Sequence, residues 1–596
     1  MHLSSDLDFD PDVLREKYRA ERDRRIRPDG LGQYRPADGR FGYFAYDPYT
    51  ERRAREPLDD HVEVVVVGGG FGGLVAAARL RMTGVEDIRV IERGGDFGGT
   101  WYWNRYPGIH CDIESYVYLP LLDEVGYVPA WKYAPGEEIR RHARAIARTF
   151  DLYRDVCFQT VVTELRWSDD AAEWVVRTDR GDRIRARYVV ISGGTLDRPK
   201  LPGIPGVDTF AGHTFHTSRW DYAYTGGDAD GGLTGLADKR VALVGTGASG
   251  IQVAPHLGRD AAHLYVFQRT PSTVDFRGNR PTDREWAASL APGWARRRRE
   301  NFLTVVHGGV ADEDLVADAW TGSARLFQKL IPTDNYAGLA PEERERDEEI
   351  ADFRKMNALR ARVDAVVEDP ATAELLKPWY RYLCKRPTFS DHYLQTFNRP
   401  NVTLVDTADH GGIERVTEHA VVVGEREYPV DCIIFATGFQ VGLSDVFTGR
   451  LPVYGRGGAG LLESWSTGPR TLHGCYSNGF PNLFQLGPLH NAPSVNFTHV
   501  LDEQAGHVAE ARRRGVTVVE PTAEAERAWV RTIDEKAVDR FAFQSECTPG
   551  YYNNEGMPLP INIQFGAGPV AYHELLRHWR ASGGMDDVMA PGTSVE

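Results

Sequence analysis

Two glycine-rich loops of the same pattern constrain the fold of this chain more than any other feature. Each loop reads Gly-x-Gly-x-x-Gly, follows an apolar run and precedes a helix-forming stretch. The glycines allow a tight turn close to a pyrophosphate, and the helix N-terminus stabilises the phosphate charge. Two such units predict an α/β chain with two Rossmann-like dinucleotide-binding domains. The six glycines are Gly68, Gly70, Gly73, Gly245, Gly247 and Gly250.

The residue at the end of the second strand of each unit distinguishes the two ligands. Glu92 and Arg269 each lie 19 residues past the last glycine of their loop. A carboxylate at this position accepts hydrogen bonds from ribose hydroxyls. A guanidinium there pairs bidentately with a 2′-phosphate, which a carboxylate would repel. We therefore predict FAD at the first unit and NADP at the second, with Thr270 beside Arg269 in the NADP site.

A segment between the two units has the spacing of a known fingerprint. It reads Phe-x-Gly-x-x-x-His-x-x-x-Trp-Asp and resembles the fingerprint of the type I Baeyer–Villiger monooxygenases. These flavoenzymes insert one oxygen atom of O2 beside a ketone carbonyl. The resemblance spans residues 11–570 and implies that the segment joins the FAD and NADP domains, with His216 and Trp220 coupling domain movement to the reaction. The fingerprint residues are Phe210, Gly212, His216, Trp220 and Asp221.

Two further segments carry the resemblance into the active site. Residues 98–112 join a glycine turn to the aromatic run Trp101–Trp103, which we expect to wall the flavin and exclude water. The resemblance implies that Asp112 supports a catalytic arginine, that Lys385 binds the NADP phosphate, and that Arg386 is the catalytic cation over the flavin. Without the resemblance, Asp112 is equally consistent with a helix cap, and the Lys-Arg pair with a basic loop. The cofactor contacts expected from the first segment are Gly99, Thr100, Trp101 and Asp112.

The resemblance also implies a reaction and a substrate class. NADPH reduces FAD, the reduced flavin captures O2 as a C4a-peroxyflavin, and the peroxyflavin attacks a small-molecule ketone to give an ester or lactone. A guanidinium beside the peroxide favours its anion and the oxyanionic addition intermediate. The N-terminal extension and the tyrosine-rich segment 547–556 are similar to the branch that includes pentalenolactone-pathway and cyclopentadecanone enzymes. A cyclic sesquiterpenoid or another bulky cyclic ketone is therefore the expected substrate.

Other flavoprotein functions share part of this pattern. A flavin-containing monooxygenase that oxidises nitrogen or sulfur atoms would have both loops, and the fingerprint argues against it. A non-catalytic dinucleotide-binding protein is a remote alternative. A disulfide reductase needs paired cysteines, whereas the six cysteines of this chain lie far apart without a C-x-x-C spacing. The same spacing indicates no metal site and predicts free thiols in a reducing cytoplasm.

The charge and hydropathy of the chain argue against some partners. The formal net charge of −15 opposes binding to nucleic acid or to an anionic membrane. The longest apolar stretch, residues 64–78, is shorter than the ~20 residues that span a bilayer. Residues 1–10 are acidic and lack the apolar segment of a secretion signal. Nothing in the sequence indicates the oligomeric state.

These observations divide the chain into six parts. The first part reads as a charged helix at residues 12–25 followed by a loop that wraps the first domain. Alternatively, residues 29–34 and the aromatic residues Phe41, Tyr43, Phe44 and Tyr46 wall part of a substrate entrance. The predicted parts are an N-terminal extension (1–60), the first part of the FAD domain (61–209), the fingerprint linker (210–221), the NADP domain (222–392) with a helical insertion (280–380), the second part of the FAD domain (393–520), and a C-terminal region with a mobile loop (521–596).

Overall fold

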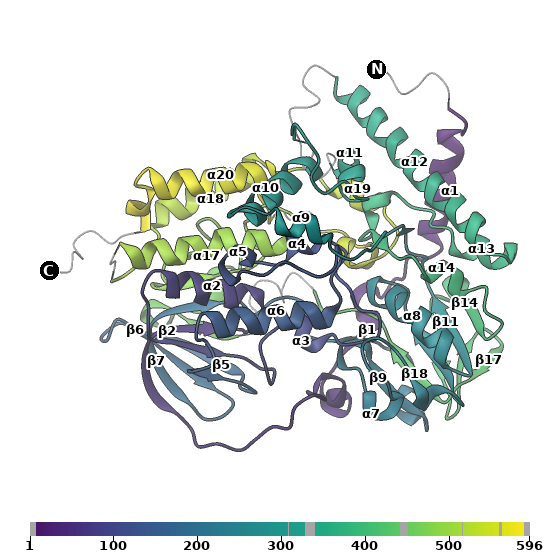
Figure 1. Ribbon diagram of the computed structural model, residues 1–596, viewed down its shortest axis with the longest axis horizontal. Coiled ribbons are helices and arrows are strands. Elements are labelled where there is room, and N and C mark those ends of the chain that lie inside the picture. The colour runs from purple at the N-terminus through teal and green to yellow at the C-terminus, as the bar shows by residue number, and fades with distance from the viewer. Residues whose placement is uncertain are drawn as a thin grey trace.

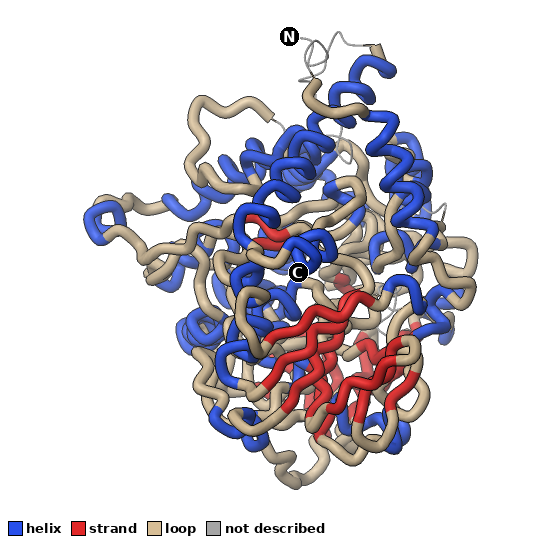
Figure 2. Tube along the Cα trace, turned by 90° about the vertical axis from the view of Figure 1, so that its right-hand side faces the viewer, coloured by secondary structure: helices blue, strands red, loops and turns tan. Residues whose placement is uncertain are grey.

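The computed structural model describes residues 7–307, 309–327, 340–441, 451–514, 517–559 and 563–588. In this part of the chain most strands lie in the lower half of the molecule, and a layer of helices covers them from above (Figures 1 and 2). The first glycine loop follows strand β2 (Asp59–Val67), and the second follows strand β10 (Arg240–Val244). The predicted α/β fold with two Rossmann-like units is therefore confirmed.

The first sheet is built around β2, which pairs in parallel with β3 and β7. Val64, Val65 and Val66 have no exposed surface, as expected for a strand covered on both faces. Helix α2 (Phe71–Met82) follows the loop and packs against α17 (Phe497–Arg513). The strand order is β19-β5-β6-β7-β2-β3-β4, with β20 also pairing β7. The bounds are β3 (Ile88–Ile91), β4 (Val156–Cys157), β5 (Val162–Ser168), β6 (Glu173–Thr178), β7 (Arg183–Ile191), β19 (Val453–Tyr454) and β20 (Leu483–Gln485).

The second sheet is wholly parallel, in the order β14-β11-β10-β18-β9. It corrects one predicted boundary: β14 and β18 lie beyond residue 392, where the sequence-based division returned to the FAD domain, yet they pair with β11 and β10. Short apolar strands carry no mark of the sheet they join, so their pairing was not visible in the sequence. The bounds are β9 (His213–His216), β11 (His263–Gln268), β14 (Val402–Asp406) and β18 (Cys432–Phe435), with helix α8 (Ala248–Asp260) after the second loop.

The predicted insertion between residues 280 and 380 is mainly helical in its described residues, with loops such as 309–320 between the helices. Its helix α10 contacts α20 (Gly568–Ala581) of the C-terminal region, whereas α12 lies beside the N-terminal helix (Figure 1). Within the described residues, no helix combines the length and apolar character needed to cross a bilayer. The helices of the insertion are α9 (Arg284–Ala288), α10 (Trp294–Val306), α11 (Ala324–Phe327), α12 (Pro341–Val366) and α13 (Pro370–Leu376).

The N-terminal extension is tied to the rest of the molecule at two places. Helix α1 (Pro11–Asp23), capped by the Asp10 side chain, lies beside α12 and buries Leu14 and Tyr18 there (Figure 1). Strand β1 (Tyr34–Pro36) pairs antiparallel with β8 (Lys200–Pro202), which leads into the fingerprint segment. The extension thus reaches the junction between the two nucleotide units.

The C-terminal region joins the second unit through a disulfide between Cys384 and Cys547. The prediction of free thiols is therefore wrong for these two residues. They lie 163 residues apart, so no local spacing indicates the bond. The other four cysteines are free and buried. Cys547 begins the segment 547–556, which we call the tyrosine loop.

The remaining elements are short or peripheral. The other helices are α3 (Thr100–Trp103), α4 (Ser115–Tyr118), α5 (Leu122–Val125), α6 (Gly136–Thr149), α7 (Tyr222–Thr225), α14 (Tyr393–Thr396), α16 (Leu461–Ser464), α18 (Ala523–Glu535), α19 (Phe541–Glu546) and α20 (Gly568–Ala581). The other strands are β12 (Val274–Asp275), β13 (Thr388–Phe389), β15 (Arg415–Val416), β16 (Ala420–Val423) and β17 (Arg426–Pro429).

Candidate active site

One cavity of about 1250 Å³ runs between the two glycine loops. It is larger than the roughly 300–1,000 Å³ of a typical small-molecule pocket, so it has room for cofactor groups as well as a substrate. Residues from both ends of the chain line it together with the predicted site. The predicted residues on its wall are Gly68, Gly70, Glu92, Gly99, Thr100, Trp101, Asp112, Gly245, Gly247, Arg269, Thr270, Lys385 and Arg386.

The first loop has the geometry that a bound pyrophosphate requires. Gly68 has φ +107°, and a Cβ atom there would lie 2.4 Å from the carbonyl oxygen of Ser192. A Cβ atom at Gly73 would lie 1.9 Å from the carbonyl oxygen of Gly68. Gly73 does not line the cavity, because its role is to let helix α2 approach the strand. Only glycine fits at either position.

Glu92 is buried at the end of β3 and organises the first loop. Its two carboxylate oxygens accept hydrogen bonds from the backbone N–H groups of Gly69 and Gly94, both at 2.6 Å. Burial raises the pKa of this carboxyl group, although the two N–H groups act to lower it. A carboxylate has about four acceptor sites, so ribose hydroxyls can still bind. The residue therefore fits the predicted FAD site.

The second loop repeats this geometry and leaves its middle open. Gly245 has φ +104°, and a Cβ atom there would lie 2.7 Å from the carbonyl oxygen of Ala436 at the end of β18. Gly250 approaches the carbonyl oxygen of Gly245 as Gly73 approaches that of Gly68. A Cβ atom at Gly247 would meet nothing within 4 Å, so this side of the loop is free for a phosphate.

A cluster of polar residues lies at the end of the second unit. It contains three cations, one hydroxyl and one carboxylate, and we call it the phosphate cradle: Lys200, Arg269, Lys385, Thr270 and Glu555. Lys385 makes no hydrogen bond or ion pair with the described residues; burial, together with the charge of Arg269, lowers its pKa to about 8. The hydroxyl of Thr270 is buried and also lacks a partner in the described part of the chain. Unpaired donors of this kind, the buried hydroxyl of Thr270 and the half-buried ammonium of Lys385, fit a 2′-phosphate, as NADP requires.

Lys200 and Glu555 were not predicted as site residues. Glu555 pairs with Arg269 at 2.8 Å and with Lys200 at 3.4 Å. Neither residue stands in a nucleotide motif, and a glutamate runs against the signal expected for a phosphate site. Only the fold brings the two residues to Arg269.

Asp112 holds two arginines beside the cavity. One oxygen accepts a hydrogen bond from Arg386, and the other accepts one from Arg277 at 2.9 Å. The Arg386 side chain is 34% exposed and lines the cavity, whereas that of Arg277 is only 9% exposed. Burial alone would lower the pKa of Arg386, but Asp112 raises it above its ordinary value. Arg386 is therefore a fixed cation on the cavity wall, and its catalytic role stays a prediction. Arg277 is a second partner of Asp112 that the sequence did not reveal.

The aromatic run after the first loop only partly matches its predicted role. Trp101 and Trp103 line the cavity, and the indole N–H of Trp101 donates to the hydroxyl of Tyr118 at 2.9 Å. Tyr102 is buried away from the cavity, in contact with Asp47. Gly99, just before the run, packs against the first loop: a Cβ atom at Gly99 would lie 2.6 Å from Cα of Gly70. Two of the three aromatic side chains can therefore wall a flavin.

The fingerprint residues lie outside the cavity and support the second sheet. His216, at the end of β9, is fully buried, and burial lowers its pKa to about 3, so the ring is neutral. Trp220 is buried and donates to the Thr225 hydroxyl at 3.1 Å. Asp221 caps α7. Phe210 covers Gly212, where a Cβ atom would lie 2.5 Å from the phenyl ring. None of the five is placed to touch a substrate, as the resemblance implied.

The two flanking segments reach the cavity in different ways. Gln33 and Tyr34 of the extension line it, but the aromatic residues 41–46 do not, so the expectation that they wall an entrance is not met. Phe44 instead packs in the core against Phe435. Tyr551 and Tyr552 of the tyrosine loop line the cavity and remain about half exposed.

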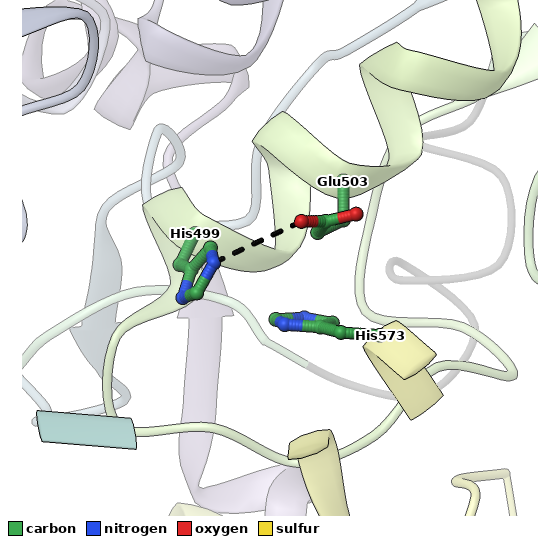
Figure 3. A group of neighbouring side chains, drawn as sticks. All are labelled: His499, Glu503 and His573. Atoms are coloured by element: carbon green, nitrogen blue, oxygen red, sulfur yellow. Dashed lines mark ion pairs between the residues drawn. The ribbon is translucent and has the colours of Figure 1, made fainter. Parts of the chain in front are cut away.

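A buried histidine pair, His499 and His573, lies beside Glu503 (Figure 3). None of these three residues lines the cavity. His499, Glu503 and His573 place possible ligand atoms within 4.8 Å of one another, and neither nitrogen of His573 has a partner among the described residues. The Glu503 oxygens already accept hydrogen bonds from Arg577 at 2.6 Å and Arg580 at 3.1 Å. Two guanidinium groups on the carboxylate oppose a divalent cation, so we assign this group to the packing of α17 against α20.

Comparisons with known proteins agree with this geometry. The pyridine nucleotide-disulphide oxidoreductase family matches residues 65–284. A Baeyer–Villiger monooxygenase of Streptomyces coelicolor is 61% identical over 98% of this chain and 97% of its own length, and a pentalenolactone D synthase of Streptomyces arenae is 54% identical over 96% and 99%.

Solved structures extend the same likeness to the fold and the cofactors. A polycyclic ketone monooxygenase from the fungus Thermothelomyces thermophila has a TM-score of 0.90 and 39% identity, covering 97% of this chain and 98% of its own. A more distant structure, described as a complex with FAD and NADP, has a TM-score of 0.70 and 27% identity over 89% of this chain and 99% of its own. These relatives cover most or nearly all of this chain, and the chain therefore belongs to the Baeyer–Villiger monooxygenases, flavoproteins that use FAD and NADP.

Proposed function

We propose that this enzyme uses NADPH and O2 to insert an oxygen atom beside the carbonyl of a bulky cyclic ketone, with a sesquiterpenoid ketone as the leading substrate class. The observation that carries the proposal is the Asp112–Arg386 pair on the cavity wall between the two loops. The substrate class is supported by the size of the cavity and by the names of the pentalenolactone D synthase and polycyclic ketone monooxygenase relatives.

Bound FAD supplies the redox chemistry that activates O2. The residues of the chain then have separate tasks. Arg386 presents a permanent positive charge where negative charge develops on the reacting oxygen atoms, and such a preorganised charge is most effective in a site from which water is excluded. One carboxylate oxygen of Asp112 fixes the Arg386 guanidinium, and Arg277 holds the other oxygen of Asp112. Trp101 and Trp103 restrict the access of water.

The nucleotide contacts follow from the two units. Glu92 and the first loop hold FAD, with Gly99, Thr100 and Trp101 beside it. Arg269, Thr270 and Lys385 hold the 2′-phosphate of NADP at the second loop. The fingerprint residues, which lie outside the cavity, couple domain movement to the reaction; His216 stands at the end of β9, which pairs with β18 at the edge of the second sheet.

Product analysis of the purified holoenzyme tests the reaction class. We expect a tricyclic sesquiterpenoid ketone to accelerate NADPH oxidation and to give a lactone that carries one atom from ¹⁸O2. A thioether of similar size is expected to give little sulfoxide. Sulfoxide as the main product, with no lactone from any ketone, would assign the chain to sulfur oxygenation instead.

We also propose that the enzyme acts in the cytoplasm, where NADPH is supplied. The Cys384–Cys547 disulfide is unusual for that compartment. Fractionation of cells that produce the protein checks this: we expect the lactone-forming activity in the soluble intracellular fraction, and activity in the culture medium would contradict it.

A further inference from the structure

Arg269 of the phosphate cradle is held from both ends of the chain. Its Nη1 group donates to Oε1 of Gln33 in the N-terminal extension at 2.8 Å. Its Nη2 group donates to Oε2 of Glu555 in the tyrosine loop, also at 2.8 Å. A guanidinium carries five N–H groups, so donors remain for a bound phosphate. Of the two partners of Arg269, Gln33 is neutral and Glu555 is negatively charged.

Gln33, the neutral partner of Arg269, belongs to a segment that several hydrogen bonds attach to the rest of the molecule. Arg25 donates through Nε to the carbonyl oxygen of Arg269 at 2.8 Å. The carbonyl oxygen of Gln33 accepts a hydrogen bond from the N–H of Gly203 at 2.7 Å, next to the β1–β8 pair. The ring of Tyr34 lies 4.0 Å from the ammonium of Lys200. The extension thus orients two cations of the cradle without adding a negative charge to it.

Glu555, the charged partner of Arg269, is a buried carboxylate. Glu555 is only 2% exposed, and both of its oxygens face cations of the cradle. Burial alone would raise its pKa, but Arg269 and Lys200 lower it below its ordinary value, so the carboxylate is ionised. Glu555 has φ +59°, in the left-handed region that is unfavourable for a long side chain. Its ion pairs and the hydrogen bond from its N–H to the carbonyl oxygen of Gly550 at 2.8 Å hold this turn together.

The charges of the cradle explain what this carboxylate does. Three cations, Lys200, Arg269 and Lys385, surround it. A phosphate monoester carries a charge of about −1.5 to −2 at pH 7 and seeks the same cations. Two anions that share one small cluster of cations repel each other, and this repulsion is strong where little water screens it.

We propose that Gln33 and Glu555 act on the same guanidinium in opposite ways. Gln33 is a positioning residue that aims Arg269 at the 2′-phosphate of NADPH. Glu555 is an internal anion that competes with the 2′-phosphate for the same cations and so limits the affinity for this phosphate. A ligand without this phosphate does not compete with Glu555, so its affinity does not depend on Glu555. The inference rests on the proposed placement of NADP at the second unit.

The test uses a ligand that carries the 2′-phosphate and no nicotinamide. The dissociation constants of 2′,5′-ADP and 5′-AMP are measured by titration calorimetry on the FAD-loaded full chain. Gln33→Leu is expected to weaken 2′,5′-ADP binding by roughly fivefold, the effect of one lost hydrogen bond. Glu555→Gln is expected to tighten it by roughly fivefold to tenfold, because repulsion is removed while the shape is kept. Binding of 5′-AMP is expected to stay the same in both variants.

Two matched controls separate these effects from general damage. Glu546→Gln removes an exposed acid nine residues before Glu555, and Arg40→Ala removes an exposed arginine of the same extension, which pairs with Asp208. Both are expected to bind 2′,5′-ADP like the unmodified enzyme. The KM for NADPH should rise in Gln33→Leu and fall in Glu555→Gln, with kcat retained.

The opposite signs make the inference easy to overturn. Weaker binding of 2′,5′-ADP in both variants would mean that Glu555 is a structural partner of Arg269 and no competitor. Unchanged or tighter binding in Gln33→Leu would remove its positioning role. Misfolding cannot produce the gain expected for Glu555→Gln. If the unmodified enzyme binds 2′,5′-ADP no better than 5′-AMP, the NADP placement itself fails and this inference falls with it.

Discussion

The two nucleotide units have the same loop and helix but hold their selective residue in different ways. In the first unit, the Glu92 carboxylate accepts hydrogen bonds from the backbone N–H groups of Gly69 and Gly94. Gly69 belongs to the glycine loop of the same unit, and Gly94 follows Glu92 by two residues. In the second, Arg269 is held by side chains from the two ends of the chain, Gln33 and Glu555. The first site is therefore a local structure, and the second is an assembly of distant segments.

This difference matches the tasks of the two cofactors. A flavin that stays bound through many reaction cycles suits a site that forms with the strand and loop themselves. A nicotinamide cofactor must be selected, and its site here is closed by the extension and the tyrosine loop. We infer that substitutions at the first site affect retention of FAD, and that substitutions at the second affect selectivity for NADPH.

The sharpest test of this contrast removes the guanidinium of the second unit. Arg269→Ala is expected to raise the KM for NADPH by roughly 10- to 100-fold, because it removes charge-assisted hydrogen bonds worth about 1.5–3 kcal/mol. The KM for NADH should change little. Steady-state kinetics with both cofactors measures the split. An equal loss with NADPH and NADH would show that Arg269 does not read the phosphate.

The matching change in the first unit affects the flavin. Glu92→Gln puts an amide where both oxygens now accept from backbone N–H groups, so one buried donor loses its partner at a cost of about 1–3 kcal/mol. We expect a lower FAD content per chain after purification and an unchanged ratio of the KM values for NADPH and NADH. A variant with full FAD content and altered cofactor selectivity would break the comparison.

The smallest expected effect is a pH dependence at the cradle. Lys385 has a pKa lowered to about 8 by burial and by its neighbours Arg269 and Lys200, with Glu555 acting against them. The ammonium is charged below this pH and neutral above it, so attraction for the 2′-phosphate is present below pH 8 and lost as the pH rises through 8. The KM for NADPH should therefore rise several-fold between pH 7 and 9.

Two comparisons define that measurement. Lys385→Arg keeps its charge over this range and should flatten the profile. The KM for NADH should be flat in both proteins. A rise of equal size for NADH would assign the pH dependence to another group.

The sequence predicted most of what lies close to a motif. The glycine loops, Glu92, Arg269 and the Asp112–Arg386 pair stand where the spacing and the resemblance put them. These features are recognisable because strand, turn and helix signals are local, and a short pattern therefore carries the geometry with it.

What the sequence missed depends on contacts between distant segments. Arg277 reaches Asp112 across 165 residues, and Glu555 reaches Arg269 across 286. The strands β14 and β18 are apolar like those of the first sheet, so their composition could not assign them to the second. The two cysteines of the Cys384–Cys547 bond are 163 residues apart in sequence, so no local spacing predicts this bond. Such partners are fixed by packing of the whole chain.

The central claim is that the cation held by Asp112 directs activated oxygen to a carbonyl. The most direct measurement is the ratio of lactone formed to NADPH consumed by Arg386→Ala, loaded with FAD and supplied with a ketone that the unmodified enzyme converts. We predict continued NADPH oxidation with lactone formation reduced by on the order of 10²–10³, the usual effect of losing one such electrostatic group. Lactone formation at the unmodified rate in that variant would contradict the account.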